Sequence, residues 1–431
     1  AMQATANSVR APARCARGSA SHRRQAAAAV AQTVDAARIG KAVRVSASGQ
    51  KGSTFCGGRS LSLASSLAGA RTHARASLKV SASNEYNMQT LTTWLLEEEG
   101  KGNVENELVI VLTSIATACK QIANLVKRAP IEGMVGLAGS ANESGDEQKM
   151  LDVVANEVFR NAVADSGRTA IMASEEEDAP VALESSAGGN YIVCFDPIDG
   201  SSNIDAAVTT GAIFGIYSPG ECVIEDFDEP ESIVEKCMLN VRRSGNELVS
   251  AGYCMFSSST IMVLSIGSGV YGFTLDTNVG EFILSHRDLK IPDPGQKIYS
   301  CNEGNTGLWA PELRAYVQHL KDAEAQGGSP YSYRYIGALV GDFHRTLLYG
   351  GIWLYPPDST APNGKARLLY EVAPMSFLAE QAGGYAMWGT LADKRVLDVV
   401  PQEVHQRSSL FIGSKTEIGK LQDWLVSYPS A

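Results

Sequence analysis

Seven short strand-like runs follow one another between residues 169 and 285, and this series limits most strongly how the chain can fold. Each run is apolar or alternates apolar with polar residues, and glycine-rich turns separate them. The runs cover residues 169–173, 191–195, 212–217, 247–255, 260–266, 270–275 and 281–285. A series of this kind predicts one large mixed sheet.

Helical patterns precede the sheet region. Apolar residues between 105 and 128 recur at helical spacing, and Pro130 is expected to end that helix. A second amphipathic pattern covers residues 146–159. Since Asp146 and Asp152 are six positions apart and do not share one helical face, we expect Asp146 in the preceding loop and Asp152 inside the helix.

Helices and strands alternate again towards the C-terminus. The paired prolines of residues 291–295 mark the predicted boundary between two units. Beyond this boundary, helices are expected over residues 311–325 and 374–381, and the second should end at Gly383 and Gly384. The predicted architecture is therefore two packed α/β units.

The first 84 residues differ from the rest of the chain in charge. They contain thirteen Lys or Arg residues and one acidic residue, Asp35, which leaves 24 basic and 46 acidic residues and a formal charge of −22 for residues 85–431. A basic, Ser-rich and acid-poor beginning predicts an organelle transit peptide, and the alternative is a basic arm that binds nucleic acid or membrane. The acidic remainder argues against nucleic acid as a partner, and we expect no apolar run to be long enough to span a membrane.

An acidic motif directly follows one of the predicted strands. Residues 194–205 read CFDPIDGSSNID and contain three carboxylates. Pro197 restricts the backbone and Gly200 permits a close approach, so Asp196 and Asp199 should point to one place at a tight turn. Neighbouring carboxylates repel each other unless a cation lies between them, and magnesium prefers such oxygen ligands. The motif therefore predicts a site for a divalent cation.

The residues after Gly200 suit an anion. Residues 201–203 lie at what we interpret as the start of a helical turn, where backbone N–H groups can bind phosphate. A second acidic cluster, residues 174–178, also follows a strand, and Glu175 and Glu176 would complete the metal site if the two strands are neighbours. By itself this cluster is more typical of a solvated loop. The carboxylates that could together hold up to three ions are Asp146, Glu175, Asp196 and Asp199.

Longer motifs resemble the fructose-1,6-bisphosphatase family of magnesium-dependent, lithium-sensitive sugar phosphatases. They are GDEQKMLDVVANEVF, ASEEED, FDPIDGSSNIDAAVTTGAIFGIYSP, YSCNEGN, YRYIGALVGDFHRTLLYGGIWLYP and NGKARLLYEVAPMSFLAEQAGG. With the basic beginning, the chain is similar to the plastid form. The resemblance implies an α/β fold, a layered αβαβα sandwich of two mixed-sheet domains. We divide the chain into a transit peptide (1–84), a domain with the metal site and an acidic redox loop at 218–237 (85–292), and a sugar-phosphate domain (293–431).

The resemblance also implies a metal site, a catalytic pair and a phosphate-binding turn. The metal ligands of the family, one of them the backbone oxygen of Ile198, fall on Asp146, Glu175, Asp196, Ile198, Asp199 and Glu371. Asp152 and Glu176 match the pair that orients and deprotonates the attacking water. The residues around the 1-phosphate match Asp199, Gly200, Ser201 and Ser202.

Other matched residues bind the sugar and the second phosphate. Those that hold the distal phosphate fall on Asn302, Tyr335, Tyr355 and Lys365. Arg334 matches a residue that reaches into a neighbouring subunit's site, which implies a homotetramer, and Arg367 matches one near the sugar and the 1-phosphate. A second phosphate requires cations and phenol donors of this kind. The implied reaction is Mg2+-dependent hydrolysis of fructose 1,6-bisphosphate to fructose 6-phosphate, in the Calvin cycle and starch synthesis.

An acidic loop is bounded by Cys222 and Cys237, and it carries six acidic residues against one lysine. Without the resemblance, two unrelated thiols beside a solvated loop are the simpler interpretation. In plastid members an insertion here carries a disulfide that thioredoxin controls, so the resemblance implies a Cys222–Cys237 bond, reduced to activate the enzyme in the chloroplast stroma. We expect the bond to disturb Glu175 through Phe214 and Ile216 of the adjoining strand.

The other cysteines and the histidines show little sign of chemistry. The chain has eight cysteines without a CxxC pair for zinc. His344 is expected to be a packed helix residue, since a lone imidazole suits magnesium poorly. The thiols expected in the core are Cys119, Cys194, Cys254 and Cys301.

Two alternatives to the fructose enzyme stay open. Sedoheptulose-1,7-bisphosphatase shares the metal motifs and the compartment, although YSCNEGN and NGKARLLYE match the fructose enzyme better. A catalytically inactive scaffold of the same fold would have lost metal ligands, whereas every expected carboxylate is present.

Overall fold

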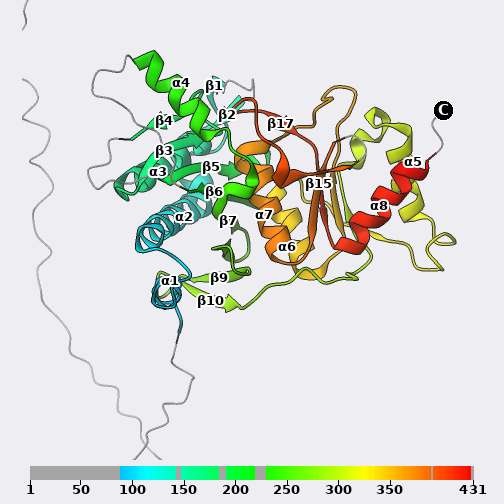
Figure 1. The fold of residues 1–431 in the computed structure, drawn as a ribbon, viewed down its shortest axis with the longest axis horizontal. Coiled ribbons are helices and arrows are strands. Elements are labelled where there is room, and N and C mark those ends of the chain that lie inside the picture. The colour runs from blue at the N-terminus through cyan, green and yellow to red at the C-terminus, as the bar shows by residue number, and fades with distance from the viewer. Residues whose placement is uncertain (1–87, 142–146, 184–190, 219–229, 390–391, 429–431) are drawn as a thin grey trace, which may run out of the picture. The chain divides into compact units, whose positions relative to one another are not determined.

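The structure is a computed structural model that describes residues 88–141, 147–183, 191–218, 230–389 and 392–428 (Figure 1). The predicted transit peptide, residues 1–84, lies outside this part. The helices in the described part are α1 (Leu91–Gly100), α2 (Asn106–Glu132), α3 (Met150–Asp165), α4 (Pro230–Val241), α5 (Pro311–Lys321), α6 (Leu339–Tyr349), α7 (Ala373–Gln381) and α8 (Lys415–Ser427).

All seven predicted strand runs are strands, and they lie in one sheet. They are β3 (Thr169–Ser174), β5 (Tyr191–Asp199), β6 (Thr210–Tyr217), β7 (Leu248–Phe256), β8 (Thr260–Ser265), β9 (Tyr271–Asp276) and β10 (Glu281–His286). With β4 (Val181–Ala182), the order is β10-β9-β8-β7-β6-β5-β3-β4. The sheet is mixed, as predicted, because β3 and β5 pair in parallel and the other neighbours are antiparallel.

A second mixed sheet of six strands follows residue 295. Its strands, in spatial order, are β12 (Ser332–Tyr333), β11 (Ile298–Ser300), β13 (Ile352–Tyr355), β18 (Leu410–Gly413), β15 (Tyr385–Trp388) and β16 (Lys394–Arg395). Two short pairs stand apart from the large sheets: β1 (Leu137–Ala141) with β2 (Glu147–Lys149), and β14 (Ala366–Arg367) with β17 (Arg407–Ser408).

Buried side chains on alternating strand faces set the layers. Along β5, Val193 and Phe195 pack in the cluster that contains the apolar faces of α1, α2 and α3, whereas Ile192 and Cys194 pack in the cluster shared with α6 and α7. A third cluster joins α5 and α8 to the second sheet. The order of layers is therefore helices, sheet, helices, sheet, helices, and Figure 1 shows α6 and α7 beside the first sheet and α5 and α8 at the opposite end. This confirms the α/β sandwich expected from the resemblance.

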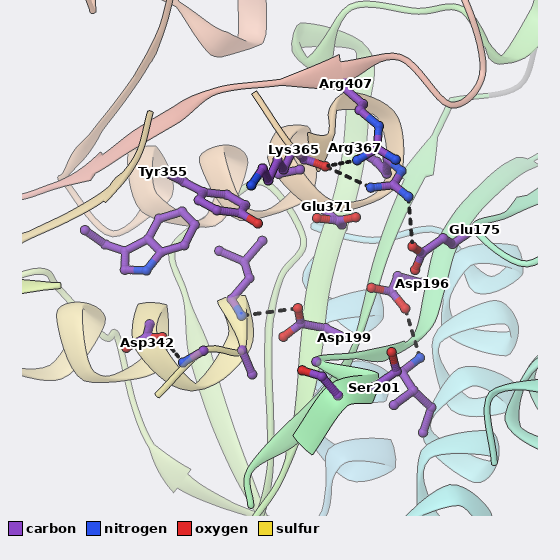
Figure 2. Close-up of a pocket in the computed structure, with 18 of the residues that line it drawn as sticks. Glu175, Asp196, Asp199, Ser201, Asp342, Tyr355, Lys365, Arg367, Glu371 and Arg407 are labelled. Carbon is purple, nitrogen blue, oxygen red and sulfur yellow. Dashed lines mark hydrogen bonds and ion pairs between the residues drawn. The ribbon is translucent and has the colours of Figure 1, made fainter. Parts of the chain in front are cut away.

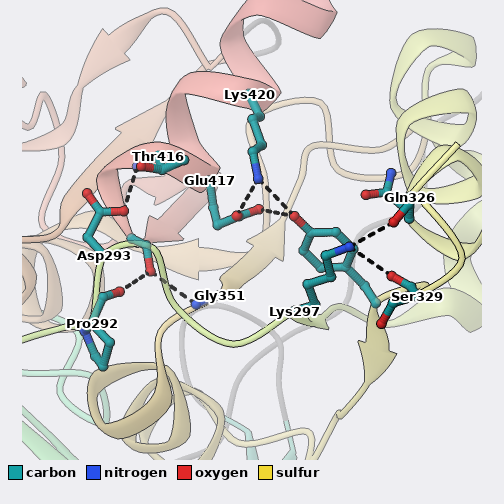
Figure 3. Close-up of polar contacts among 11 residues, drawn as sticks. Pro292, Asp293, Lys297, Gln326, Ser329, Gly351, Thr416, Glu417 and Lys420 are labelled. Carbon is teal, nitrogen blue, oxygen red and sulfur yellow. Dashed lines mark hydrogen bonds and ion pairs between the residues drawn. The ribbon is translucent and has the colours of Figure 1, made fainter.

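The proline-containing segment 291–295 is tied to the start of α8 (Figure 3). The Ser414 hydroxyl donates to the Pro292 carbonyl at 2.7 Å and accepts from the Gly351 N–H at 3.1 Å. The Thr416 N–H donates to the Asp293 carboxylate at 3.2 Å. The two large sheets lie on either side of this segment in the sequence, while the division into two domains at residue 292 stays a prediction.

The ends of three predicted helices differ from the structure. Pro130 does not end α2, because its fixed φ suits a helix and only one backbone hydrogen bond is lost so close to the end. The helix ends at Glu132, and the left-handed φ of 72° at Gly133 turns the chain so that the N–H of Met134 donates to the Ala129 carbonyl at 2.9 Å. Helix α3 covers Met150–Asp165 instead of the predicted residues 146–159, because residues 147–149 form β2. Helix α5 ends at Lys321 instead of residue 325.

The expectation that no apolar run is long enough for a membrane span is wrong for α2. This helix has 27 residues and is long and apolar enough by length and composition. Many of its apolar side chains, among them Leu112, Ile115 and Ile122, are buried in the cluster between α1, α3 and the first sheet. A helix in a protein core has the same apolar composition, and the packing of α2 in this cluster explains its composition.

Candidate active site

A cavity of about 340 Å3 lies where the end of β5, the start of α6 and the chain around β14 meet (Figure 2). Most of its polar lining comes from residues that the sequence predicted. Those residues are Glu175, Asp196, Asp199, Ser201, Ser202, Tyr335, Tyr355, Lys365, Arg367 and Glu371. Segments almost 200 residues apart in the sequence therefore meet in one polar cavity.

Strand β5 carries the acidic motif further than predicted. It does not end before Asp196 but continues through Pro197 to Asp199. Its pairing with β6 shifts register between Asp196, opposite Ile213, and Asp199, opposite Gly211. A bulge of this kind turns side chains away from strict alternation. Both carboxylates therefore reach the cavity from a strand, and the turn begins only at Gly200.

Three carboxylates from three segments converge beside this strand. Ligand oxygens of Glu175, Asp196 and Glu371 lie within 4.8 Å of one another. Burial and then the charges of Glu175 and Glu371 raise the pKa of Asp196 well above its usual value. Burial and then Glu175 likewise raise the pKa of Glu371. Buried carboxylates this close together repel each other in their charged forms unless a cation lies between them. The set of donor oxygens therefore fits a divalent metal ion.

Glu371 reaches the cluster from a short π-helical turn, residues Leu368–Val372, that runs directly into α7. The sequence analysis did not predict this turn, although single π turns occur often at functional sites. The Arg367 guanidinium precedes the turn and lies 3.6 Å from a Glu175 oxygen. Arg367 is 5% exposed, and its charge counteracts the effect of burial on the pKa of Glu175.

Asp199 is held by the N-terminus of α6. Its carboxylate accepts hydrogen bonds from the backbone N–H groups of Leu339 at 3.2 Å and Val340 at 2.8 Å. Burial raises the pKa of Asp199 to about 6, and these two hydrogen bonds act in the opposite direction. The contact orients Asp199 across the boundary between β5 and the middle layer of helices.

The turn after β5, which we call the phosphate turn (residues 200–203), is helical at the predicted residues. Gly200 has a left-handed φ of 79°, and Ser201–Asn203 form a single 3-10 turn. A Cβ at Gly200 would lie 2.7 Å from the Ala338 Cβ at the start of α6. Glycine is therefore required at position 200 for two reasons: the left-handed backbone conformation, and the lack of space for a Cβ beside Ala338.

Asp152 and Glu176 lie beside the carboxylate cluster and not on the cavity wall. Asp152 is 2% exposed, near the start of α3, and burial raises its pKa to about 7, to which the charge of Glu176 also contributes. One of its oxygens accepts from the Lys149 N–H at 2.8 Å, and the other is buried without a hydrogen-bond partner among the described residues. Glu176 accepts a hydrogen bond from the Gln148 side chain. A carboxyl group with a pKa near neutrality suits general acid–base chemistry.

Cations and phenols line the far side of the cavity. Lys365 is paired with Asp358 at 3.4 Å, and the Lys365 carbonyl accepts a hydrogen bond from Arg367 at 2.8 Å. Tyr335 and Tyr355 present phenol groups, and burial raises the pKa of Tyr335 to about 12. The cavity thus offers positive charge and neutral hydroxyl donors opposite the carboxylates.

Some predicted residues are not brought to this cavity. The Asn302 side chain accepts from the Gly304 N–H at the start of a 3-10 turn. Arg334 lines a separate cavity of about 410 Å3 with Lys297 and Arg345. Asp146 and Cys222 fall outside the described residues.

Seven residues that line the cavity were not expected from the sequence, and three of them have charged or aromatic side chains. Arg407 arrives because β17 pairs with β14 and places it opposite Arg367. Asp342 accepts from the backbone N–H groups of Ile336 and Gly337 and so shapes the loop before α6. Trp353 enters from β13. An acidic residue in the first turn of a glycine-rich helix start was a usable signal for Asp342, whereas nothing local marked Arg407.

The core predictions for the cysteines and His344 are confirmed. His344 is a buried residue of α6, and its Nδ1 forms a 2.7 Å hydrogen bond with the Tyr253 hydroxyl. Cys237, on α4, is also buried. The thiols predicted in the core are fully buried, namely Cys119, Cys194, Cys254 and Cys301.

Comparison with known proteins agrees with this site and fold. The family model for the fructose-1-6-bisphosphatase N-terminal domain matches residues 89–287, and the model for the C-terminal domain of the same family matches residues 291–426. Together with the layered fold and the carboxylate cluster, these matches define a sugar phosphatase that uses a divalent metal. The chain belongs to the fructose-1,6-bisphosphatase family.

The relatives at high identity are plant proteins. Chloroplastic fructose-1,6-bisphosphatase of Brassica napus is 57% identical over 343 residues, which are 79% of this chain and 82% of the relative. Fructose-1,6-bisphosphatase 1, chloroplastic, of Arabidopsis thaliana is 54% identical over 373 residues, 86% of this chain and 87% of the relative. These relatives place the chain with the chloroplast enzymes.

Solved structures show the same fold. The holo form of Leishmania major fructose-1,6-bisphosphatase has 40% sequence identity and a TM-score of 0.72, and the match covers 78% of this chain and 98% of that one.

Proposed function

We propose that this chain removes the 1-phosphate of fructose 1,6-bisphosphate, with Mg2+ as the metal, to give fructose 6-phosphate and phosphate. The observation that carries the proposal is the cavity with a carboxylate cluster at one end and Lys365, Tyr335 and Tyr355 at the other. A substrate with two phosphates requires such a site, because each phosphate needs its own cation or donors. A monophosphatase would have no use for the second set.

Each group on the wall has a role in this proposal. Asp199, Ser201 and Ser202 bind around the 1-phosphate, and the buried Arg367 places its charge between that phosphate and the sugar. Lys365, Tyr335 and Tyr355 hold the distal phosphate, and Asn302, which does not line this cavity, would have to move to join them. Asp152 and Glu176 orient the attacking water and accept its proton, for which the raised pKa of Asp152 is suited.

The carboxylate cluster is the proposed metal site. The cluster itself is Glu175, Asp196 and Glu371. Asp199, Asp146 and the backbone oxygen of Ile198 would complete the ligand set. A bound Mg2+ would polarise the phosphoryl oxygens and lower the pKa of a coordinated water. The protein's own contribution is to hold these oxygens together at a buried place, so that binding the ion relieves their repulsion.

We also propose the plastid regulation and assembly. The enzyme would act in the chloroplast stroma, in the Calvin cycle and starch synthesis, as a homotetramer in which Arg334 reaches a neighbouring site. Thioredoxin would activate it by reducing a Cys222–Cys237 disulfide. The support is that Cys237 packs in the cluster with Ile171 and Ala173 of β3, the strand that leads to Glu175.

The route of this redox effect needs revision. Phe214 and Ile216, the residues first expected to carry it, belong to the cluster on the other face of the sheet. Helix α4 packs instead against β3 and β4. A strain at Cys237 would therefore reach Glu175 through β3. Cys222→Ser should abolish the rise in activity on reduction, and an unchanged rise would contradict the disulfide.

The first experiment measures phosphate release by the reduced full chain with fructose 1,6-bisphosphate and sedoheptulose 1,7-bisphosphate in parallel. We expect a strong preference for the fructose substrate with Mg2+ and none with EDTA. Preference for the seven-carbon substrate would support the sedoheptulose alternative. Release from neither substrate would support the inactive scaffold.

A further inference from the structure

We propose that Asp205, the third carboxylate of the acidic motif, is a positioning residue that ties the N-terminus of α3, and with it Asp152, to the phosphate turn. This inference rests on the proposed function, because it takes Asp152 as the base. Asp205 follows the phosphate turn by two residues and does not line the cavity. Its carboxylate contacts a segment about 60 residues earlier in the sequence instead.

Both carboxylate oxygens of Asp205 are used. Oδ1 accepts from the backbone N–H of Gly136 at 2.9 Å, and Oδ2 lies 2.8 Å from the Lys149 ammonium. Gly136 directly precedes β1 and Lys149 is the last residue of β2, and this pair leads into α3. One short side chain thus holds both ends of this pair against the turn that follows β5.

Both contacts continue to the start of α3. The Gly136 carbonyl accepts from the N–H of Met150, the first residue of the helix, at 3.1 Å. The backbone N–H of Lys149 donates to the Asp152 carboxylate at 2.8 Å. Two hydrogen-bonded paths therefore lead from Asp205 to the residues that orient Asp152. Among the residues that the structure describes, the Lys149 N–H is the one hydrogen-bond partner of the Asp152 side chain, so the position of that side chain depends on residue 149.

A solvent-exposed ion pair by itself would be a weak argument, since such pairs contribute about 0–1 kcal/mol to the stability of a folded protein. The side chain of Asp205 is 41% exposed and that of Lys149 is 19% exposed. The contact differs from an ordinary surface pair because it includes a backbone donor and because both paths end at the start of α3, the helix that carries Asp152. Its effect should therefore appear in turnover and much less in stability, since small displacements of reacting groups are costly.

The chain offers a matched control. Lys120 and Glu281 form an ion pair at 2.6 Å with side-chain exposures of 26% and 42%, and it joins α2 to β10 away from the cavity. Glu281→Ala removes a pair of similar burial without touching α3. It should leave kcat unchanged.

The test compares the full-length parent with Asp205→Ala, Asp205→Asn, Lys149→Met and Glu281→Ala. We expect Asp205→Ala to lower kcat about tenfold, with KM for fructose 1,6-bisphosphate and the melting temperature close to the parent's. Asp205→Asn keeps an oxygen that can accept from the Gly136 N–H, and Lys149→Met keeps Asp205 itself. The kcat of both variants should therefore lie between those of the parent and of Asp205→Ala. In the Asp205→Ala background, Lys149→Met should lower kcat by a smaller factor than in the parent. The reason is that the contact between residues 149 and 205 is already lost in that background.

Hydrogen exchange gives a readout that needs no turnover. The amides of Lys149 and Met150 should exchange faster in Asp205→Ala and at the parent's rate in Glu281→Ala. The inference is overturned if Asp205→Ala keeps kcat within twofold of the parent, if Glu281→Ala loses as much, or if exchange does not change. Should the parent itself release no phosphate, the proposed function fails, while the exchange data still decide whether Asp205 holds α3.

Discussion

The Oδ2 atom of Asp199 accepts a 2.8 Å hydrogen bond from the backbone N–H of Val340. This bond joins the end of β5 to the first turn of α6, and the N-terminus of a helix favours the charged form of a carboxylate. Asp199→Asn removes that charge and leaves an amide facing backbone donors. We expect kcat to fall on the order of a thousandfold, comparable to losing a group that stabilises the transition state. Near-parent turnover at saturating Mg2+ would contradict the assigned site.

Mg2+ should reverse which of two proteins is the more stable, the parent or the Asp196→Asn variant. Asp196 is buried among carboxylates that raise its pKa, so Asp196→Asn should be at least as stable as the parent in EDTA. Adding Mg2+ should raise the melting temperature of the parent and much less that of the variant, because only the intact cluster binds the ion tightly. Thermal unfolding with and without Mg2+ checks this. An equal rise in melting temperature in the parent and the variant would mean that the ion binds at a site other than the carboxylate cluster.

Gly200 and Gly133 form a matched pair for testing the phosphate turn. Both have left-handed φ, but a Cβ at Gly133 meets nothing within 4 Å, whereas at Gly200 it meets Ala338. Gly133→Ala should cost about 1–2 kcal/mol of unfolding free energy from conformation alone. Gly200→Ala should cost more and should also lower kcat, because α6 or the turn must move. Equal costs and unchanged turnover would mean that the close approach is unimportant.

Lys365 should act on binding more than on chemistry. Removing its charge by Lys365→Met should raise KM for fructose 1,6-bisphosphate about tenfold and leave kcat within about twofold, as expected for binding equal in ground and transition states. Asp358 would keep its hydrogen bonds to Thr360 and Ala361, so the loop should not collapse. Steady-state kinetics measures the split. A fall in kcat at unchanged KM would place Lys365 at the reacting phosphate.

His344 predicts a pH dependence of stability. Burial, and then the charge of His286, lowers the pKa of His344 to about 4, while in the unfolded chain it is about 6.5. Between these values the unfolded state binds the proton and the folded state does not, so stability falls as pH drops from about 6.5 to 4. The loss by pH 5 is roughly 2 kcal/mol.

Urea unfolding at pH 7 and pH 5 tests this, with His344→Gln as the comparison. The variant cannot titrate at this position, so its free energy of unfolding should fall less between the two pH values. Tyr253 is the hydrogen-bond partner of His344 and does not titrate in this range. The same fall in both chains would assign the acid sensitivity to other groups.

Local patterns in the sequence determined the elements and the chemical identity of the site. Alternation along residues 191–195 set which β5 side chains face which layer, and apolar spacing set α2. The acidic motif and the family motifs were enough to name most of the cavity wall. These signals are local because strand and helix periodicities are properties of neighbouring residues.

Tertiary structure alone decided how these residues meet. The bulge that carries Asp199 into the cavity depends on pairing with β6, and Arg407 arrives only because β17 pairs with β14. Helix α2 continues past Pro130 because one lost hydrogen bond so close to its end is a small loss. Glu175, Asp196 and Glu371 converge because β3 and β5 are neighbours in one sheet and the π turn before α7 packs against β5 and β6 of that sheet. Such convergence depends on contacts between distant segments, which no local pattern encodes.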